Sequence, residues 1–550
     1  MSEQSKKQSF LGGAAILAGA VAVVKVIGAL YKLPLNNILG DVGKTYFQTA
    51  YEIYNVLLTV STAGLPLAIS KLTSQAHARG RENEKRKIFR TAIWLFFALG
   101  LIGSCLMFFG AQGLADFQRN SMAAAPIRAL APAVFCVCLL ACMRGYTQGQ
   151  GNMGPTAVSQ VLEALCKLGV GLPLAWYILK KTQEAGTAAQ LAAGSDGMEN
   201  VAAGAIFGVT VGTILSMVFL ILYLLRHRDS TPSDDVPRSS GYLLRRILAI
   251  GVPITLGNCA MSIITMIDTK IILGRLQTGL GLTEVAASAL KGQYSYAMDM
   301  LNMVASFVYP VTMSLIPFAA AALAQGDKRG ASRTVNSAFR ILALLALPAG
   351  VGLSVLSTPI MVLVLPAQRE GALAAGPHLR ILGIACIFVC LMILTNAILQ
   401  TYGKEHLPIF TVIVGGVVKI VMNYILVGNP NIGIHGAPWS TLCCYGVIAG
   451  LNLFFVWKYS PRKPHYFRLF ARPVFASALM GLAAWAVCSL VSKLLSGHSA
   501  YGANAIAALC GILAGVAVYG VLVIALGLLR ADDVKNIRGG QKLIRLLHLR

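Results

Sequence analysis

The sequence predicts an all-α polytopic membrane protein with about fourteen transmembrane helices: two parallel six-helix repeats followed by two C-terminal helices. Of its 550 residues, 56% are hydrophobic and only 12% are charged, whereas soluble domains carry about a quarter charged residues. Long apolar stretches recur along the chain, and two groups of them resemble each other. The net charge of +25 is spread in short clusters between these stretches, so we expect membrane topology, and not nucleic acid, to account for it.

Fourteen apolar stretches are long enough to cross about 30 Å of hydrocarbon. Their centres lie near residues 20, 58, 100, 133, 168, 213, 257, 305, 350, 390, 417, 447, 482 and 516. The first is too long for a cleavable signal, and thirteen more follow it. The twelve cysteines lie inside apolar stretches without a CxxC pair, so we interpret them as small core residues and not as disulfides or metal ligands.

The arginines and lysines predict the orientation. With the N-terminus in the cytoplasm, 31 of these 46 residues fall on the inner side, 11 fall on the outer side and four lysines lie within spans. Cytoplasmic loops of membrane proteins carry such an excess. Both termini are therefore predicted to be cytoplasmic, which agrees with an even number of spans.

An internal repeat divides the chain. The stretch that begins at Gln48 resembles the one that begins at Gln293, at an offset of 245 residues, and Pro155 and Pro408 lie at matching places 253 residues apart. Because six spans is an even number, both copies insert the same way. We therefore expect an N-terminal six-helix lobe at 1–228, a cytoplasmic linker at 229–240, a C-terminal six-helix lobe at 241–460, and two extra helices with a basic tail at 461–550.

Charged residues inside the predicted spans are the candidate site residues, because a charge in hydrocarbon is costly unless it faces a partner or a wet cavity. Lys25 and Lys32 are seven residues apart and share one face of a helix, although Lys32 could instead reach the headgroups. Lys25, Lys270 and Lys419 outnumber the acidic partners on the same face, which favours a cavity for an anion such as phosphate. The candidate substrate-binding residues are Lys25, Lys32, Lys270, Lys419 and Glu52.

Four other charged positions have different interpretations. Glu163 and Lys167 are spaced i, i+4 and are expected to form a structural ion pair. Asp268 and Lys270 lie two residues apart, so they point to different sides of a helix and cannot pair with each other. Asp299 is the last of these four positions, and it also lies within a predicted span.

Motifs for catalysis are missing from the sequence. The eight histidines show no metal-ligand spacing, and the GKT at 43–45 lacks the first glycine of a phosphate-binding loop because residue 38 is isoleucine. The glycine-rich stretch at 144–156 follows no strand and is expected to be a tight cytoplasmic turn. The sequence therefore predicts no catalytic residues, no metal site and no cofactor, and an enzyme is disfavoured.

Two patterns near the N-terminus, together with RGYTQGQGNMGPTAVSQ at 144–160, carry a family resemblance. The patterns are K-x-x-G-x-x-Y-K-x-P-L at 25–35 and L-G-x-x-G-x-x-Y-F-Q at 39–48. They resemble the SpoVB/YtgP branch of the MOP superfamily, which is related to the MurJ lipid II flippases and to the Wzx-type oligosaccharide flippases. The resemblance extends over nearly the whole chain.

This resemblance implies a fold and a function. It implies two helical bundles around a cavity that opens alternately to each side and moves an undecaprenyl-pyrophosphate-linked saccharide outward across the bacterial cytoplasmic membrane. Lys25 matches the first cationic residue of the first helix in MurJ-type proteins, whereas Tyr31 and Lys32 replace an Arg-Asp pair. The last two helices would hold the lipid tail. The partners expected are this substrate and membrane lipids, with the protein as a monomer.

The resemblance also suggests coupling to Na⁺, to H⁺ or to the membrane potential, with Asp268 and Asp299 as candidates. Two alternatives stay open, one within transport and one from another class. A MATE-type exporter of cationic drugs would favour an acidic cavity, and a non-transporting scaffold for spore or wall assembly would leave the buried charges without a role.

Overall fold

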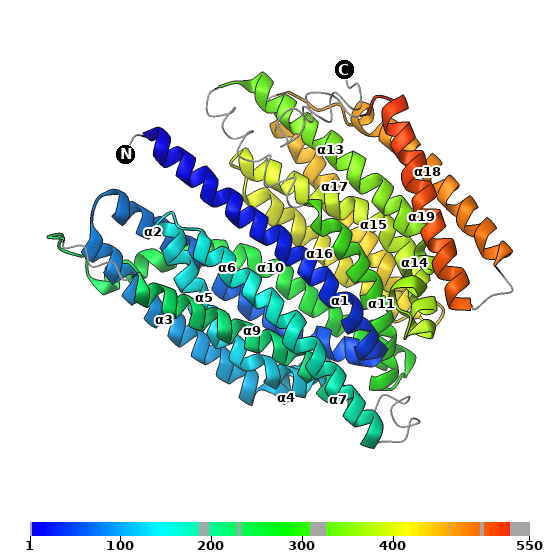
Figure 1. Cartoon of the computed structure of the whole chain (residues 1–550), viewed down its shortest axis with the longest axis horizontal. Helices are drawn as coiled ribbons and strands as arrows, with labels where there is room; N and C mark the ends of the chain where they lie inside the picture. The colour runs from blue at the N-terminus through cyan, green and yellow to red at the C-terminus, as the bar shows by residue number, and fades with distance from the viewer. Residues whose placement is uncertain are drawn as a thin grey trace. The chain divides into compact units, whose positions relative to one another are not determined.

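The structure is a computed structural model that describes residues 3–185, 197–227, 233–308, 326–460, 462–495 and 500–528. Within these ranges every regular element is a helix and no strand occurs. Contacts divide the chain into two compact units, Met1–Gly292 (unit 1) and Gln293–Arg550 (unit 2). Figure 1 shows the helices of both units.

The first helix, α1 (Glu3–Thr62), is broken at Gly40, which has φ 60° and ψ −175°. This conformation is open to glycine and strained for other residues. A straight helix of 60 residues would be about 90 Å long, three times the hydrocarbon thickness. The break at Gly40 therefore divides α1 into two segments, which contain the predicted stretches centred near residues 20 and 58.

Unit 1 continues through a series of further helices. They are α2 (Leu65–Ala78), α3 (Glu82–Phe109), α4 (Ala111–Phe117), η1 (Ser121–Ala123), α5 (Ala124–Gly149), α6 (Gly154–Cys166), the π-helical η2 (Lys167–Gly171), α7 (Leu172–Ala185), α9 (Met198–Arg226), α10 (Ser240–Leu280) and α11 (Glu284–Ser306). The last of these, α11, continues into unit 2.

Helix α5 forms the core of unit 1 and packs against α1, α2, α3 and α9. A Cβ atom on Gly145 or Gly149 would lie 2.7 Å from the carbonyl oxygen of Pro66 or Ser70 in α2. Small residues let membrane helices approach this closely. The glycine-rich stretch predicted as a turn therefore begins inside α5, because two of its glycines serve helix packing; the chain turns only at 150–153.

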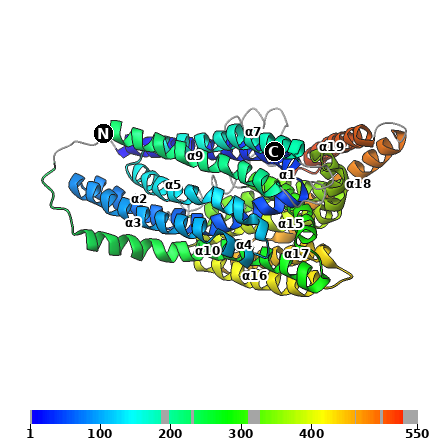
Figure 2. The same cartoon turned by 90° about the horizontal axis from the view of Figure 1, so that it is seen from below.

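Among its described residues, unit 2 contains the second half of α11 and eight further elements. These are α13 (Lys328–Val355), α14 (Ser357–Val364), α15 (Arg369–Thr401), α16 (His406–Val427), η3 (Gly433–His435), α17 (Gly436–Tyr459), α18 (Tyr466–Leu494) and α19 (Ala500–Ala525). Helix α15 packs against α13 and α17, and α16 packs against α17. Helices α18 and α19 lie side by side in Figures 1 and 2, and α18 packs on α13.

The fold class predicted from the sequence is confirmed: the chain is an all-α polytopic membrane protein. Among the described residues, eleven helices are long and apolar enough to cross a membrane, or twelve when the two parts of α10, bent by 41°, are joined. The predicted total of about fourteen is higher for two reasons. One candidate span, Gly19–Ala78, contains two predicted stretches, and the stretch near 305 runs into residues 309–325, outside the described part.

The division by contacts does not fall at the linker. Unit 1 ends at Gly292, because α10 packs against α1, α2 and α3. The predicted lobes at 1–228 and 241–460 concern duplication of the sequence, which contacts do not measure, so the repeat stays a prediction. Much of the basic tail, residues 529–550, lies outside the described residues.

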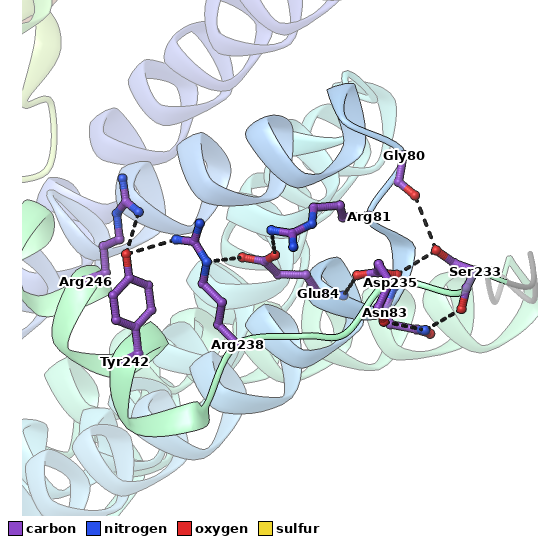
Figure 3. A network of polar contacts seen from close by, with 9 residues as sticks. All are labelled: Gly80, Arg81, Asn83, Glu84, Ser233, Asp235, Arg238, Tyr242 and Arg246. Atoms are coloured by element: carbon purple, nitrogen blue, oxygen red, sulfur yellow. Dashed lines mark hydrogen bonds and ion pairs between the residues drawn. The ribbon is translucent and has the colours of Figure 1, made fainter.

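The described part of the linker is attached to the start of α3 (Figure 3). The Asp235 carboxylate accepts hydrogen bonds from the backbone amides of Asn83 and Glu84, each at 2.9 Å, and from the Ser233 hydroxyl at 2.6 Å. Partial burial would raise the pKa of Asp235, but these hydrogen bonds outweigh it and the pKa is lowered. Asp235 thus caps α3, whose own N-cap residue Arg81 supplies no side-chain hydrogen bond.

Candidate functional site

Lys25 and Lys32 both lie in the first segment of α1. Lys25 is exposed and Lys32 is half-buried, and the two charges are close enough to act on each other. Tyr31 beside them is buried, and its hydroxyl donates a hydrogen bond to the Ala205 carbonyl of α9 at 3.3 Å. Packing of Tyr31 against α9 therefore fixes the orientation of α1 at the position of Lys32.

A second group of charges gathers where α1, α10 and α11 meet within unit 1. Glu52 of α1 is 4% exposed, Asp268 of α10 is 2% exposed and Lys291 of α11 is 4% exposed. The charges of Asp268 and Lys291 both act on Glu52. We call Glu52, Asp268 and Lys291 the charged cluster.

The charged cluster depends on a close approach of α11 to α1. A Cβ atom on Gly292 would lie 1.8 Å from the Asp41 carbonyl oxygen, so only glycine fits there. One turn earlier, the Thr45 hydroxyl donates a hydrogen bond to the Ser288 carbonyl at 2.6 Å. These contacts place Lys291, the neighbour of Gly292, beside the polar side of α1.

A polar cavity of about 230 Å³ adjoins Glu52. Its walls are Glu52, Asn55 and Thr59 of α1 together with Met261, Ser262 and Thr265 of α10. The Gln48 amide donates a hydrogen bond to Glu52 Oε1 at 3.1 Å, while Oε2 has no hydrogen-bond partner among the described residues. A carboxylate, an amide and three hydroxyls can hold water or a polar group here.

Glu163 holds two cations. Its Oε1 atom lies 3.2 Å from Lys167 Nζ, and its Oε2 atom lies 3.4 Å from Arg144 Nη2. The Arg144 Nε–H also donates a hydrogen bond to the Ser159 hydroxyl at 2.9 Å. Lys167 is the first residue of the π-helical segment η2, a kind of local bulge that often marks functional sites.

Lys270, Asp299 and Lys419 are the remaining predicted site residues. Lys270 is half-buried, and its Nζ lies 3.4 Å from the centre of the Phe117 ring, whereas Asp268 on the same helix is buried. Asp299 and Lys419 belong to unit 2 and are 6% and 8% exposed. The structure therefore brings Glu52 and Asp268 together, and separately Lys25 and Lys32, within unit 1.

Several cations that were assigned to loops in the sequence are buried or paired in the structure. Examples are Lys291 in the charged cluster, Arg144 beside Glu163, and Lys44, whose Nζ donates a hydrogen bond to Asn36 at 2.8 Å and is 2% exposed. A signal existed for Lys291. The residues 285–290 before it are small or apolar, which is typical of a buried helix and not of a loop.

The fold and the buried charges define a multi-pass membrane protein of the transporter or flippase class. The family model described as "Polysaccharide biosynthesis protein" matches residues 10–322, and a model described as MatE matches residues 253–425. The first match covers more than half of the 550 residues. The chain therefore belongs to the polysaccharide biosynthesis protein family, within the MOP superfamily.

Three proteins of Bacillus subtilis (strain 168) match almost the entire chain. The membrane protein YabM is 25% identical over 98% of this chain and 96% of its own length. Stage V sporulation protein B is 23% identical over 96% of this chain and 98% of its own length. Lipid II flippase MurJ is 24% identical over 92% of this chain and 94% of its own length. The chain is thus similar in extent to whole proteins of the superfamily.

Solved structures share the fold. A lipid II flippase MurJ in the inward closed conformation has a TM-score of 0.66 at 14% identity, covering 93% of this chain and 99% of that one. An inward-facing multidrug resistance MATE transporter has a TM-score of 0.59 at 16% identity, covering 82% of this chain and 98% of that one. The fold is therefore that of MOP-superfamily transporters and flippases.

Proposed function

We propose that the chain is a flippase for a lipid-linked oligosaccharide or a lipid II-type peptidoglycan precursor. It moves the undecaprenyl-pyrophosphate-linked saccharide outward across the bacterial cytoplasmic membrane by alternating access, with both termini in the cytoplasm. The observation that carries the proposal is the placement of Lys25 and Lys32 close together on one segment of α1, within an apolar span. A charge within an apolar span is costly unless it faces a partner or a wet cavity, and an anionic headgroup in such a cavity would be attracted to both lysines.

A pyrophosphate headgroup matches this chemistry. Lysine acts as a compact charge that can follow a moving phosphate without a fixed geometry. Lys25 and Lys32 would draw the headgroup away from the lipid surface. Lys270 and Glu52 in unit 1 and Lys419 in unit 2 are the other proposed substrate-binding residues. Asp268 in the charged cluster and Asp299 in unit 2 are the proposed sites of Na⁺ or H⁺ coupling, alongside the membrane potential.

Replacement of Lys25 tests the proposal. In proteoliposomes that contain a fluorescent lipid II analogue, Lys25→Ala should reduce outward flipping about 5- to 30-fold, because loss of one close ionic contact costs on the order of 1–2 kcal/mol. Lys25→Arg should keep part of the activity. Lys328→Ala, at an exposed lysine at the start of α13, is the matched control and should flip at the wild-type rate. Wild-type flipping by Lys25→Ala would refute the anion site.

A MATE-type exporter is the second candidate, favoured by the MatE match over residues 253–425 and by the carboxylates of the charged cluster. It predicts that proteoliposomes accumulate a cationic dye such as ethidium and that Glu52→Gln abolishes this uptake. Dye transport without lipid flipping would decide for the exporter. Lipid flipping without dye transport would decide against it.

A further inference from the structure

A basic cavity of about 860 Å³ lies in unit 1 where α3 meets the linker and the start of α10. Helix α3 contributes Arg86, Lys87, Arg90 and Trp94 to one wall, and the opposite wall includes Leu244 of α10. None of the residues described in its lining is acidic. The cavity is separate from Lys25 and from the charged cluster, so neither the substrate site nor the coupling sites proposed above use it.

Two of its cations have no counterion among the described residues. Lys87 is half-buried and Arg90 is exposed, and neither makes a hydrogen bond or ion pair within the part of the chain that the structure describes. Arg86 donates a hydrogen bond to Asn83 at 3.3 Å. The positive charge of the cavity is therefore available to an external anion.

Three carboxylates near the cavity, those of Glu82, Glu84 and Asp235, already have partners in the protein. Glu84 accepts a hydrogen bond from Arg81 at 2.6 Å and lies 3.7 Å from Arg238 (Figure 3). Glu82 pairs with His77 and Lys85. Asp235 is occupied by the backbone amides at the start of α3. The local acids thus neutralise neighbouring groups and leave the cavity basic.

The side of the cavity farther along α3 is apolar. Trp94 is 67% exposed, and tryptophan favours the boundary between headgroups and hydrocarbon. A second cavity, of about 560 Å³, shares Gly241 and Leu244 with the first. It passes Arg245 and then continues along α10 past the apolar residues Leu248 and Val252. The two cavities form one groove that is basic at one end and apolar at the other, which we call the lipid groove.

We propose that the lipid groove binds an anionic phospholipid, with its phosphate at Arg86, Lys87 and Arg90 and an acyl chain along α10. From Arg86 to Trp94 the helix rises about 12 Å, a distance suited to the step from a headgroup to the hydrocarbon. The hydroxyls of Thr91 and Ser240 in the lining can donate further hydrogen bonds to phosphate. The ligand is a resident lipid of the bilayer, and its binding does not depend on what the chain transports.

Quenching of Trp94 by brominated lipids measures this binding directly. The full chain is placed in nanodiscs of phosphatidylcholine with increasing fractions of brominated phosphatidylglycerol or, in parallel, brominated phosphatidylcholine. The chain has five tryptophans, so the Trp94 signal is the difference between each protein and its Trp94→Phe version. The anionic lipid should quench Trp94 at a much lower fraction than the zwitterionic lipid does.

Charge removal identifies the headgroup contacts. Arg90→Gln changes an exposed residue, which keeps folding intact, and should weaken binding of phosphatidylglycerol about fivefold, while the triple change R86Q/K87Q/R90Q should weaken it on the order of 100-fold. The matched control K328Q/R329Q/R333Q removes the same charge from the start of α13 in unit 2. It should leave Trp94 quenching unchanged.

Three outcomes would overturn the proposal. The first is equal quenching by the two lipids, and the second is an equal loss in Arg90→Gln and in the control. The third is displacement of phosphatidylglycerol by undecaprenyl pyrophosphate at a similar fraction, which would assign the groove to a polyprenyl lipid. Free inorganic phosphate should not compete at millimolar concentrations, because it lacks the acyl chain.

Discussion

At the scale of single residues, the ion pair predicted from the spacing of Glu163 and Lys167 turns out to have a third member. Arg144, on α5, lies 3.4 Å from the same carboxylate. The spacing i, i+4 identifies neighbours on one helix, but it cannot reveal a cation on a different helix. Glu163 is therefore the shared member, and the three side chains are 17–24% exposed.

Because Glu163 pairs with both cations, replacing Glu163 should cost more stability than replacing Lys167. Glu163→Gln leaves two cations without their counterion and should lower the free energy of unfolding by about 3 kcal/mol, whereas Lys167→Met leaves Glu163 paired with Arg144 and should cost about 1 kcal/mol. The double variant E163Q/K167M should recover only partly, and addition of Arg144→Met should recover more. Thermal unfolding in detergent, followed by tryptophan fluorescence, measures all four. Equal losses in the two single variants would contradict the shared role of Glu163.

Flipping rates of the same variants separate structure from substrate binding. If the three residues only neutralise one another, the triple variant should flip lipid at close to the wild-type rate. A stable triple variant without activity would instead move Lys167 or Arg144 to the list of substrate contacts.

At the scale of elements, the first turn of α3 is capped by a residue from a distant segment of the chain. Asp235 accepts hydrogen bonds from the second and third amides of the helix, the positions that an N-cap side chain normally serves. The sequence alone could indicate that 229–240 is a linker, because proline, serine and aspartate are frequent there. It could not indicate where the linker is attached, because a cap from so far along the chain leaves no local pattern.

Replacement of Asp235 should therefore loosen both the linker and the first turn of α3. Asp235→Ala should destabilise this region by about 1 kcal/mol and increase hydrogen exchange at the Asn83 and Glu84 amides. Asp234→Ala, at the exposed neighbouring residue, is the control and should leave exchange unchanged.

The same contact should depend on pH in a defined sense. Because the pKa of Asp235 is lowered in the folded protein, its contribution is complete above the ordinary aspartate pKa of about 3.9. It is lost as the pH falls through the lowered value. Exchange at Asn83 and Glu84, corrected for intrinsic rates, should thus stay flat from pH 7 to pH 4.5. Loss of protection in that interval would show that another group controls the contact.

The packing of α11 on α1 provides a second test at this scale. Gly292→Ala places a methyl group within 1.8 Å of the Asp41 carbonyl oxygen, so the helices must separate and Lys291 must move from the charged cluster. We expect a loss of about 2–3 kcal/mol, as for overpacking of a core. Gly274→Ala on α10, where the nearest atom would be 3.8 Å away, is the control. Unchanged thermal stability of Gly292→Ala would contradict this contact.

At the scale of the whole molecule, composition and apolar stretches predicted the class of fold because hydrocarbon thickness fixes the length of a span. The partners of the buried charges were harder to predict. Lys291 and Lys44 were counted as loop residues, since a single lysine in a short apolar stretch resembles a span boundary. Their burial depends on how the helices pack in three dimensions, which a local sequence pattern does not reveal.

Labelling of single cysteines checks the predicted orientation. Cysteines at Gln112 in α4 and at Ser195 or Ser499, which lie outside the described residues, should react from outside the cell with an impermeant maleimide. Cysteines at Asp234 and Arg333, both exposed positions, should react only after the membrane is permeabilised, with the parent protein as the baseline. The reverse pattern would refute cytoplasmic termini and outward transport.

The cap on α3 also has a consequence for the time course of biosynthesis. Asp235 follows Asn83 by 152 residues, which takes a ribosome about 8 to 30 s at 5–20 residues per second. During that interval the nascent chain carries the start of α3 without its cap. A ribosome stalled before residue 235 should therefore hold α3 with a frayed first turn, and release past the linker should close it.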